Sequence, residues 1–119
     1  MKKAKQTIAR GEPSAVTPAI VDHVVATIVK SCDPIRIIVF GSTASGRAGP
    51  GSDLDLLVVM ESPLPRRRRA APIRLLFSPY PCPMDILVYT PAEIDKWYGT
   101  ANHIVTEAMD TGKTAYGRT

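Results

Sequence analysis

Hydrophobic positions early in the chain follow a helical period. Between residues 18 and 31 the apolar residues recur three and four apart, as on one face of an α-helix. Thr17 can cap this segment, and Pro18 suits the first turn because no intrahelical donor is needed there. Asp33 and Pro34 end it, since a residue before proline avoids helical backbone angles. We therefore predict a helix over residues 18–31.

Three short apolar runs predict β-strands. They cover residues 35–40 (IRIIVF), 54–60 (LDLLVVM) and 84–90 (MDILVYT), and their β-branched, nearly continuous character is typical of buried strands. Residues 41–52 separate the first two runs and contain four of the eight glycines. The backbone there needs unusual angles or close approach to another group. Strands and helical segments together predict a small α/β domain.

The segment between the second and third runs has a mixed pattern. Residues 66–71 and 73–77 favour a helix that Pro72 kinks or splits. Prolines at positions 79, 81 and 83 then predict an extended, turn-rich approach to the third strand.

The last third of the chain predicts two more helices. Residues 90–93 (TPAE) have the form of a capping box with proline at the first helical position. The short helix that follows should carry Ile94 and Trp97 inward. Residues 101–111 place their apolar side chains on one face, and we expect this helix to stop at Gly112.

Length and composition limit the class of protein. A chain of 119 residues with 45% hydrophobic residues has the size of one domain with a real core. We expect residues 1–14 to be a short, flexible basic tail and residues 15–119 to form the domain. No apolar run reaches the roughly 18–20 residues that span a bilayer. The only two cysteines, Cys32 and Cys82, are typical of a reducing compartment, so we expect a cytoplasmic protein without a membrane partner.

Three aspartates are the strongest candidates for chemistry. Asp53 and Asp55 are two residues apart at the start of a strand, so their side chains share a face, roughly 6–7 Å apart along the backbone. Asp85 stands at the start of the next strand, where a carboxylate is costly to bury without a cation or donors. Alone, each is typical of a turn or cap. Together they predict a site for Mg²⁺, which favours carboxylate, water and phosphate oxygens.

The turn after the first strand is a candidate phosphate site. Gly41 lets backbone N–H groups approach an anion, and a short helix beginning at Ser42 would direct its positive end at the phosphate. Ser42 adds a hydroxyl donor. The loop has neither Walker spacing nor the dinucleotide fingerprint. The net charge of +4 favours an anionic partner without choosing among nucleotides, nucleic acid and acidic protein.

These residues together resemble the signature of a known family, the minimal nucleotidyltransferases of the DNA polymerase β-like nucleotidyltransferase superfamily. The resemblance covers residues 18–116 and rests on Gly41-Ser42, Gly46, Ser52-Asp53-x-Asp55-Leu56 and the later Asp85. One departure is Ser45 before Gly46, where many relatives have arginine; here Arg47 follows the glycine.

The resemblance implies a fold and a set of residue roles. The fold is a small mixed β-sheet with helices packed on it. Asp53 and Asp55 would hold metal on a triphosphate, and Asp85 would complete a second-metal site. Gly41, Ser42 and Ser52 would bind the nucleotide. The expected cofactor is Mg²⁺, two ions, with Mn²⁺ as a substitute, and the expected substrate is ATP.

The resemblance also implies a function and a partner. We expect a nucleotidyltransferase that moves AMP from ATP to a hydroxyl. The chain has no room for a separate substrate domain, so we expect another chain to complete the acceptor site. In the family that partner is a HEPN protein, whose tyrosine the antitoxin modifies in a toxin–antitoxin pair. The alternatives are a non-catalytic module that neutralises a HEPN protein by contact, and an antibiotic nucleotidyltransferase; nucleic acid is a less favoured partner.

A basic patch follows the second strand. It consists of Arg66–Arg69 and Arg74. The pattern is typical of a solvated helix face, and it is also compatible with a contact surface for acidic protein, RNA or the substrate's phosphates. Outside this patch, we interpret His23 as solvent-exposed and His103 as a cap or a residue on a helix face.

Overall fold

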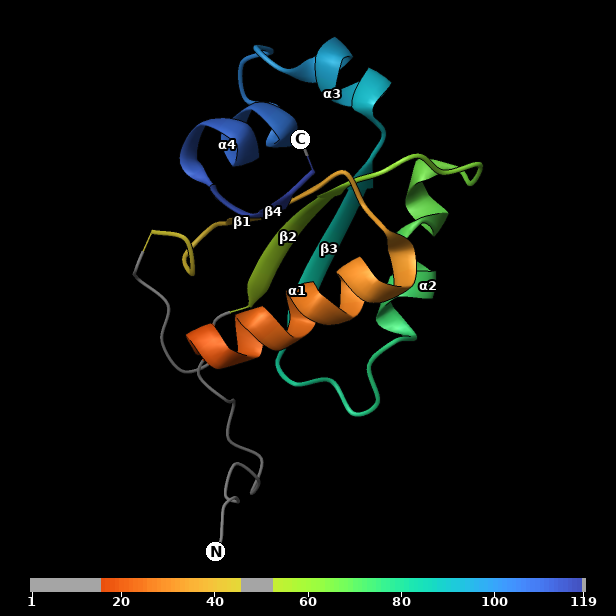
Figure 1. Cartoon of the computed structure of the whole chain (residues 1–119). Coiled ribbons are helices and arrows are strands. Elements are labelled where there is room, and N and C mark those ends of the chain that lie inside the picture. The colour runs from red at the N-terminus through yellow and green to blue at the C-terminus, as the bar shows by residue number, and fades with distance from the viewer. Residues whose placement is uncertain (1–15, 46–52, 119) are drawn as a thin grey trace, which may run out of the picture.

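The sheet is small and mixed. The computed structural model describes residues 16–45 and 53–118, and the predicted tail over residues 1–14 lies outside them. The strands of the sheet follow the spatial order β3-β2-β1-β4, with β1 antiparallel to both neighbours and β2 parallel to β3 (Figure 1). Their bounds are β1 Arg36–Phe40, β2 Leu54–Val59, β3 Met84–Tyr89 and β4 Lys113–Gly117. The predicted α/β class and the first three strands are confirmed.

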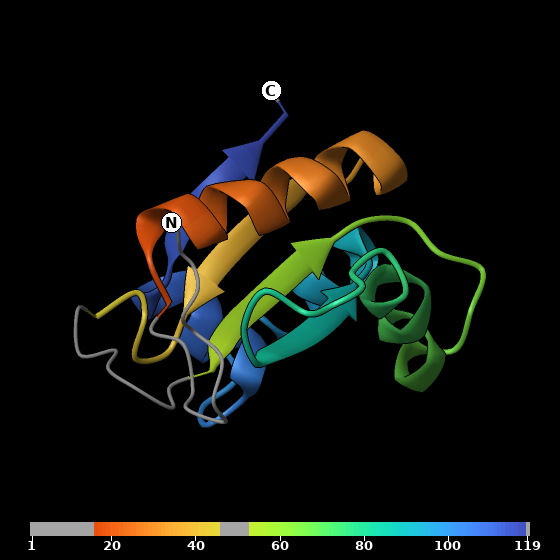
Figure 2. The same cartoon turned by 90° about the horizontal axis from the view of Figure 1, so that it is seen from below.

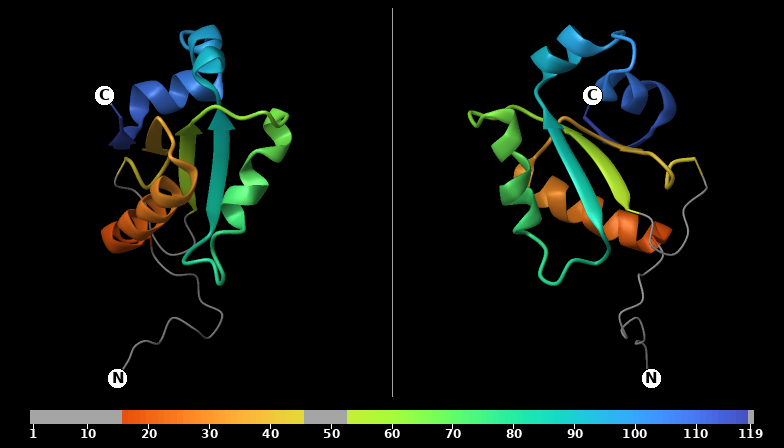
Figure 3. Two further views of the ribbon diagram at one scale, coloured as in Figure 1. Left: turned by 45° about the vertical axis from the view of Figure 1, so that its right-hand side comes forward. Right: turned by 180° about the vertical axis from the view of Figure 1, so that it is seen from behind.

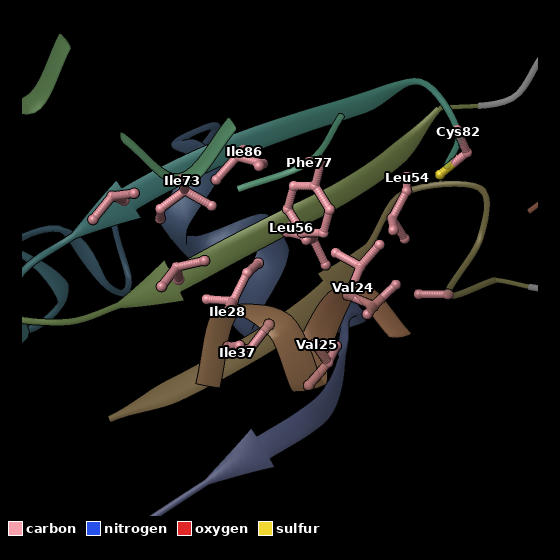
Figure 4. Close-up of a cluster of buried hydrophobic side chains, with 14 residues drawn as sticks. Val24, Val25, Ile28, Ile37, Leu54, Leu56, Ile73, Phe77, Cys82 and Ile86 are labelled. Atoms are coloured by element: carbon pink, nitrogen blue, oxygen red, sulfur yellow. The ribbon is translucent and has the colours of Figure 1, made fainter. Parts of the chain in front are cut away.

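Helices cover both faces of this sheet. Helix α1 (Pro18–Cys32) crosses one face, and α3 (Pro91–Trp97) and α4 (Ile104–Thr111) lie on the other (Figures 1 and 2). Side chains of α1 and the α1-facing strand positions form the larger buried cluster (Figure 4), and α4 packs on a second. None of the helices described, over residues 16–45 and 53–118, combines the length and hydropathy needed to cross a bilayer.

Helix α1 begins and ends where its capping residues predict. The Thr17 hydroxyl accepts a hydrogen bond from the Ile20 N–H at 3.2 Å, which satisfies one of the unpaired donors of the first turn. At the other end Asp33 adopts a left-handed conformation with φ of 49°, and its N–H binds the Val29 carbonyl. The predicted helix was one residue too short.

The segment after β2 differs from the predicted kinked helix. A 3₁₀ turn, η2 (Arg66–Arg68), is followed by α2 (Ala70–Arg74), so the break lies at Arg69 and not at Pro72. Pro72 sits in the first turn of α2, where a missing N–H costs no intrahelical bond. Beyond Arg74 the chain continues as hydrogen-bonded turns to Phe77, which is buried at 7% exposure.

The C-terminal part holds one element that the sequence pattern did not predict. Helix α4 begins at Ile104 and not at residue 101, because Asn102 has a φ of 61°, which interrupts helical geometry. After Gly112 the chain forms β4 along β1. Most side chains of β4 are exposed, so this edge strand lacks the apolar run that revealed the other three.

Candidate functional site

The alternation of β2 puts Asp55 on the face opposite to Leu54 and Leu56. Leu54 and Leu56 point toward α1 and are fully buried (Figure 4). Asp55 therefore lies on the opposite face, which α3 and α4 cover. In the parallel pairing of β2 and β3, Asp55 is directly beside Asp85, at a strand spacing of about 4.8 Å. The fold thus brings together two of the three predicted acids.

Asp53 directly precedes β2 and is exposed. Its backbone is tied to the turn after β1, because the Thr43 hydroxyl donates a hydrogen bond to the Asp53 carbonyl at 3.4 Å. The charge of Asp53 acts on the Asp55 carboxyl, so the two acids lie near each other. The turn and the start of β2 are therefore one structural unit.

Gly41 is required where the turn meets β2. It has a φ of 76°, and a Cβ placed on it would collide with the Asp55 carboxylate, meeting its Oδ2 atom first. Only glycine combines this backbone angle with so close an approach. The turn and the carboxylate of Asp55 therefore form one compact corner at the end of β1.

The predicted helix at Ser42 is not formed within the residues described, which stop at residue 45 on this side. Residues 41–45 make a single hydrogen-bonded turn, in which the Ser45 N–H binds the Gly41 carbonyl at 3.2 Å. The Ser45 hydroxyl also donates to the Ser42 carbonyl at 3.1 Å. Ser52, the third predicted nucleotide-binding residue, lies outside the described residues, as do Gly46 and Arg47.

Negative charge concentrates around Asp55. Partial burial raises the pKa of its carboxyl above the ordinary value, and the neighbouring charges of Asp85, Asp53 and Glu107 raise it further. Glu107 lies on α4 and was not singled out from the sequence, where it reads as a polar residue between apolar ones. Like charges this close favour a bound cation.

The donor set fits a hard divalent ion. It consists of carboxylate oxygens, which Mg²⁺ and Mn²⁺ prefer, with no sulfur or imidazole ligand needed. Within residues 16–45 and 53–118, however, no three His, Cys, Asp or Glu side chains already converge on one point that a metal could occupy. The pairing of β2 with β3 puts Asp55 and Asp85 side by side. The carboxylates of Asp53, Asp55 and Asp85 do not yet point at one common position.

A second feature missed from the sequence is an ion pair at the edge of β3, where Arg69 also donates to the Val88 carbonyl. The Arg69 guanidinium donates two hydrogen bonds to the Glu93 carboxylate, at 2.6 and 3.3 Å. Glu93 also accepts from the Thr90 N–H in the predicted capping box, which is confirmed. Arg69 holds the pKa of Glu93 below its usual range. The pair joins the segment before α2 to the start of α3.

His103 has a structural place next to this region. Its Nδ1 atom accepts a hydrogen bond from the Val105 N–H at 3.1 Å, which caps α4. Its ring stacks on Trp97 with centroids 4.7 Å apart. The predicted capping role of His103 is confirmed, and so are the exposure of His23 and the inward packing of Ile94 and Trp97 on the second cluster.

Comparison with known families gives the class of this chain. The model of the nucleotidyltransferase domain family matches residues 24–110, which include β1, β2 and β3 with all three aspartates. The chain belongs to this family, and its four-stranded sheet is consistent with a polymerase β-like nucleotidyltransferase fold. No curated protein and no solved structure matches the chain.

Proposed function

We propose that the protein is a metal-dependent nucleotidyltransferase that moves a nucleoside monophosphate, AMP from ATP, to a hydroxyl group. One observation carries most of this proposal. Asp55 and Asp85 lie side by side at the starts of two parallel strands, against a glycine turn that approaches the Asp55 carboxylate. Nucleotidyl transfer needs this combination of oxygen ligands and a backbone turn open to phosphate.

Each residue has a role in the proposal. Asp53 and Asp55 would hold the metal that accompanies the triphosphate, and Asp85 with Asp55 would hold a second. Two such ions, when bound, neutralise charge on the attacking and leaving oxygens. Backbone N–H groups of the turn at Gly41 and Ser42 would bind the β- and γ-phosphates. Ser52 would contribute a hydroxyl to the nucleotide.

The reaction is an in-line displacement at the α-phosphorus. The acceptor oxygen forms a bond to the α-phosphorus. The bond between the α-phosphorus and the oxygen that bridges it to the β-phosphate breaks, and pyrophosphate leaves with the electron pair. Asp85 accepts the hydroxyl proton on a carboxylate oxygen. The chain's main contributions are orientation and charge.

The proposed acceptor is a tyrosine of a HEPN-domain toxin, which the protein would neutralise as an antitoxin. This part rests on the resemblance of the GS…G…SDxDL run and Asp85 to the minimal nucleotidyltransferases. The resemblance indicates a partner, whereas the site by itself specifies only the class of reaction.

The test uses intact-mass spectrometry. Purified protein, labelled ATP and Mg²⁺ are incubated with the product of any neighbouring HEPN gene, beside an Asp53→Asn/Asp55→Asn double variant. We expect whole AMP units on the partner with the wild type and none with the variant. Absence of transfer to any hydroxyl acceptor, with ATP and metal bound, would refute the enzymatic proposal.

Two observations favour a non-catalytic binding module as the second candidate. The three aspartates do not already converge in the part of the chain described, and Ser45 replaces the arginine usual before the second glycine. A tight stoichiometric complex with the HEPN partner, equal for wild type and double variant and without modification, would support this alternative. An antibiotic nucleotidyltransferase would instead label an aminoglycoside in the same assay.

A further inference from the structure

A groove of about 580 Å³ runs along the outer side of β3. Asp85 lies at one end and Glu93 near the other, and the far wall carries Arg66, Arg67 and Arg74. The turn η2 carries Arg66 and Arg67, and helix α2, which lies beyond the edge of β3, carries Arg74; together they form that wall (Figures 2 and 3). The groove therefore leads directly to the candidate site.

The floor of the groove is a strand edge with open backbone groups. Among the described residues β3 pairs only with β2. The Leu54 N–H binds the Pro83 carbonyl and the Met60 N–H binds the Tyr89 carbonyl. By alternation, the N–H and C=O groups of Ile86 and Val88 point outward.

Part of this edge is already occupied. The Val88 carbonyl accepts a hydrogen bond from Arg69 at 3.3 Å. Within residues 16–45 and 53–118 no hydrogen-bond partner is found for the outward backbone groups of Ile86. The open stretch therefore runs from the Val88 N–H toward Asp85, and the Arg69–Glu93 pair closes its far end.

The charge of the groove is positive and only partly balanced. Arg66 lies 5.1 Å from the centroid of Tyr89 and 3.8 Å from Glu93. Arg67 and Arg74 have no ion-pair partner within the described ranges. Arg74 is half-buried and lines the groove, so its charge is available to an acidic ligand there.

We propose that this groove binds the acceptor as an extended, acidic protein segment, which adds to the edge of β3 and presents a hydroxyl side chain to Asp85. The inference rests on the proposed function, because it names the substrate class of that site. An added strand would satisfy the outward groups of Ile86, and its acidic side chains would meet Arg67 and Arg74. From Asp85 to Tyr89 the edge spans about 13 Å, room for four or five extended residues.

A single-stranded nucleic acid fits this groove less well. Base stacking needs an open aromatic face, but Tyr89 is only 7% exposed and lies next to the Arg66 guanidinium. A polynucleotide also lacks the alternating N–H and C=O groups that pair with a strand edge. The geometry favours a peptide.

The first measurement is binding, which does not depend on catalysis. The probe is a fluorescein-labelled nine-residue peptide with alternating Glu and Val around a central Tyr, read by fluorescence anisotropy. A matched peptide carries Lys in place of Glu. We expect the acidic peptide to bind about tenfold tighter or more, and to weaken as salt rises.

Two variants with equal charge change test the location. Arg67→Glu/Arg74→Glu alters the groove, and Lys30→Glu/Arg36→Glu alters exposed cations on α1 and β1. We expect the groove variant to lose at least about tenfold in affinity, and the control to change by less than about twofold. Equal losses in both would mean non-specific attraction and would overturn the proposal.

A modified peptide tests the strand pairing with unaltered protein. N-methylation of alternate residues removes backbone donors and leaves the charges in place. We expect binding of the acidic peptide to fall about tenfold or more. Unchanged binding would exclude pairing with β3, even if the groove variant failed to fold. Tighter binding of a single-stranded oligonucleotide, lost in the groove variant, would replace the peptide as ligand.

The two proposals fail separately. The Asp53→Asn/Asp55→Asn variant should still bind the peptide without transferring AMP. If the wild type binds the peptide in the groove but modifies no acceptor, the proposed reaction is wrong and the groove stands as a docking site. If AMP transfer to a protein acceptor is unaffected by Arg67→Glu/Arg74→Glu, the groove is not the acceptor site and its arginines only protect an open strand edge.

Discussion

Asp55 lies in an environment that disfavours its negative charge. Its carboxylate is partly buried, lies beside Asp85, and is the group that a side chain at Gly41 would displace. A neutral side chain at this position would make the folded protein more stable. Residues that serve chemistry often carry such a cost in stability. The close approach of Gly41 to Asp55 means that a substitution at Gly41 tests the role of this carboxylate.

Gly41→Ala should remove activity through the position of one carboxylate. The new Cβ occupies the place of the Asp55 carboxylate, so we expect at least about a hundredfold loss of nucleotidyl transfer. The left-handed backbone angle adds a stability loss of about 1 kcal/mol. Both are measured on the same preparation, by AMP incorporation and by urea unfolding.

Gly99→Ala is the matched control. Gly99 has a φ of 92°, and a Cβ there would meet nothing within 4 Å. It should show a similar loss in the free energy of unfolding with full activity. Equal loss of activity in both variants would contradict the role assigned to the Gly41–Asp55 contact.

Elements far apart in the chain are joined by the Arg69–Glu93 pair. Arg69 is only 9% exposed, and its 2.6 Å contact links the segment before α2 to the first turn of α3. Such a partly buried, two-point pair has a larger effect than exposed ion pairs, because less solvent screens it. It also fixes one end of the β3 groove.

Glu93→Gln should lower stability in a pH-dependent way. Glutamine preserves the capping box but removes the charge opposite Arg69, so we expect a loss of about 1–2 kcal/mol at pH 7. The pKa of Glu93 is lowered by Arg69 from the ordinary value of 4.5. Its contribution is therefore complete above that value and is lost as the pH falls through the lowered pKa.

The measurement is the free energy of unfolding of wild type and variant from pH 7 to pH 3. The difference between them should shrink toward zero at the acid end. Glu61→Gln, at an exposed carboxylate, should change stability by less than about 0.5 kcal/mol at any pH. A Glu93→Gln difference that stays constant with pH would contradict the ion-pair assignment.

At the scale of the whole molecule, β4 decides whether the sheet is complete. It pairs with β1 from Arg36 to Val39, and Tyr116, opposite Ile37, packs against the α1 cluster. Without β4, β1 would become an open edge next to the candidate site. Open apolar edges are prone to association.

Removal of residues 113–119 should therefore destabilise the entire domain. We expect the melting temperature to fall by more than about 10 °C, with association visible by size-exclusion chromatography. Removal of residues 118 and 119 alone keeps β4 and should shift melting by only a few degrees. A truncated chain that melts like the wild type would show that β4 contributes little.

Local chemistry in the sequence determined several features. The spacing of apolar residues, together with Thr17 and Asp33, predicted the position of α1. Residues 90–93 predicted the capping box of α3, because capping signals act within one turn of backbone. The positions of Asp53, Asp55 and Asp85 at strand starts could also be predicted, since an acid interrupting an apolar run is visible in the pattern.

Tertiary structure alone decided which of these residues meet. The parallel register that puts Asp55 beside Asp85 depends on pairing between strands, and β4 exists because β1 offers it an edge. The charge of Glu107 acts on Asp55, and Arg69 reaches Glu93, because distant segments pack together. The sequence determines which groups a chain carries and its local caps; contacts over long sequence separations arise only when the core closes, because many weak interactions then fix one arrangement together.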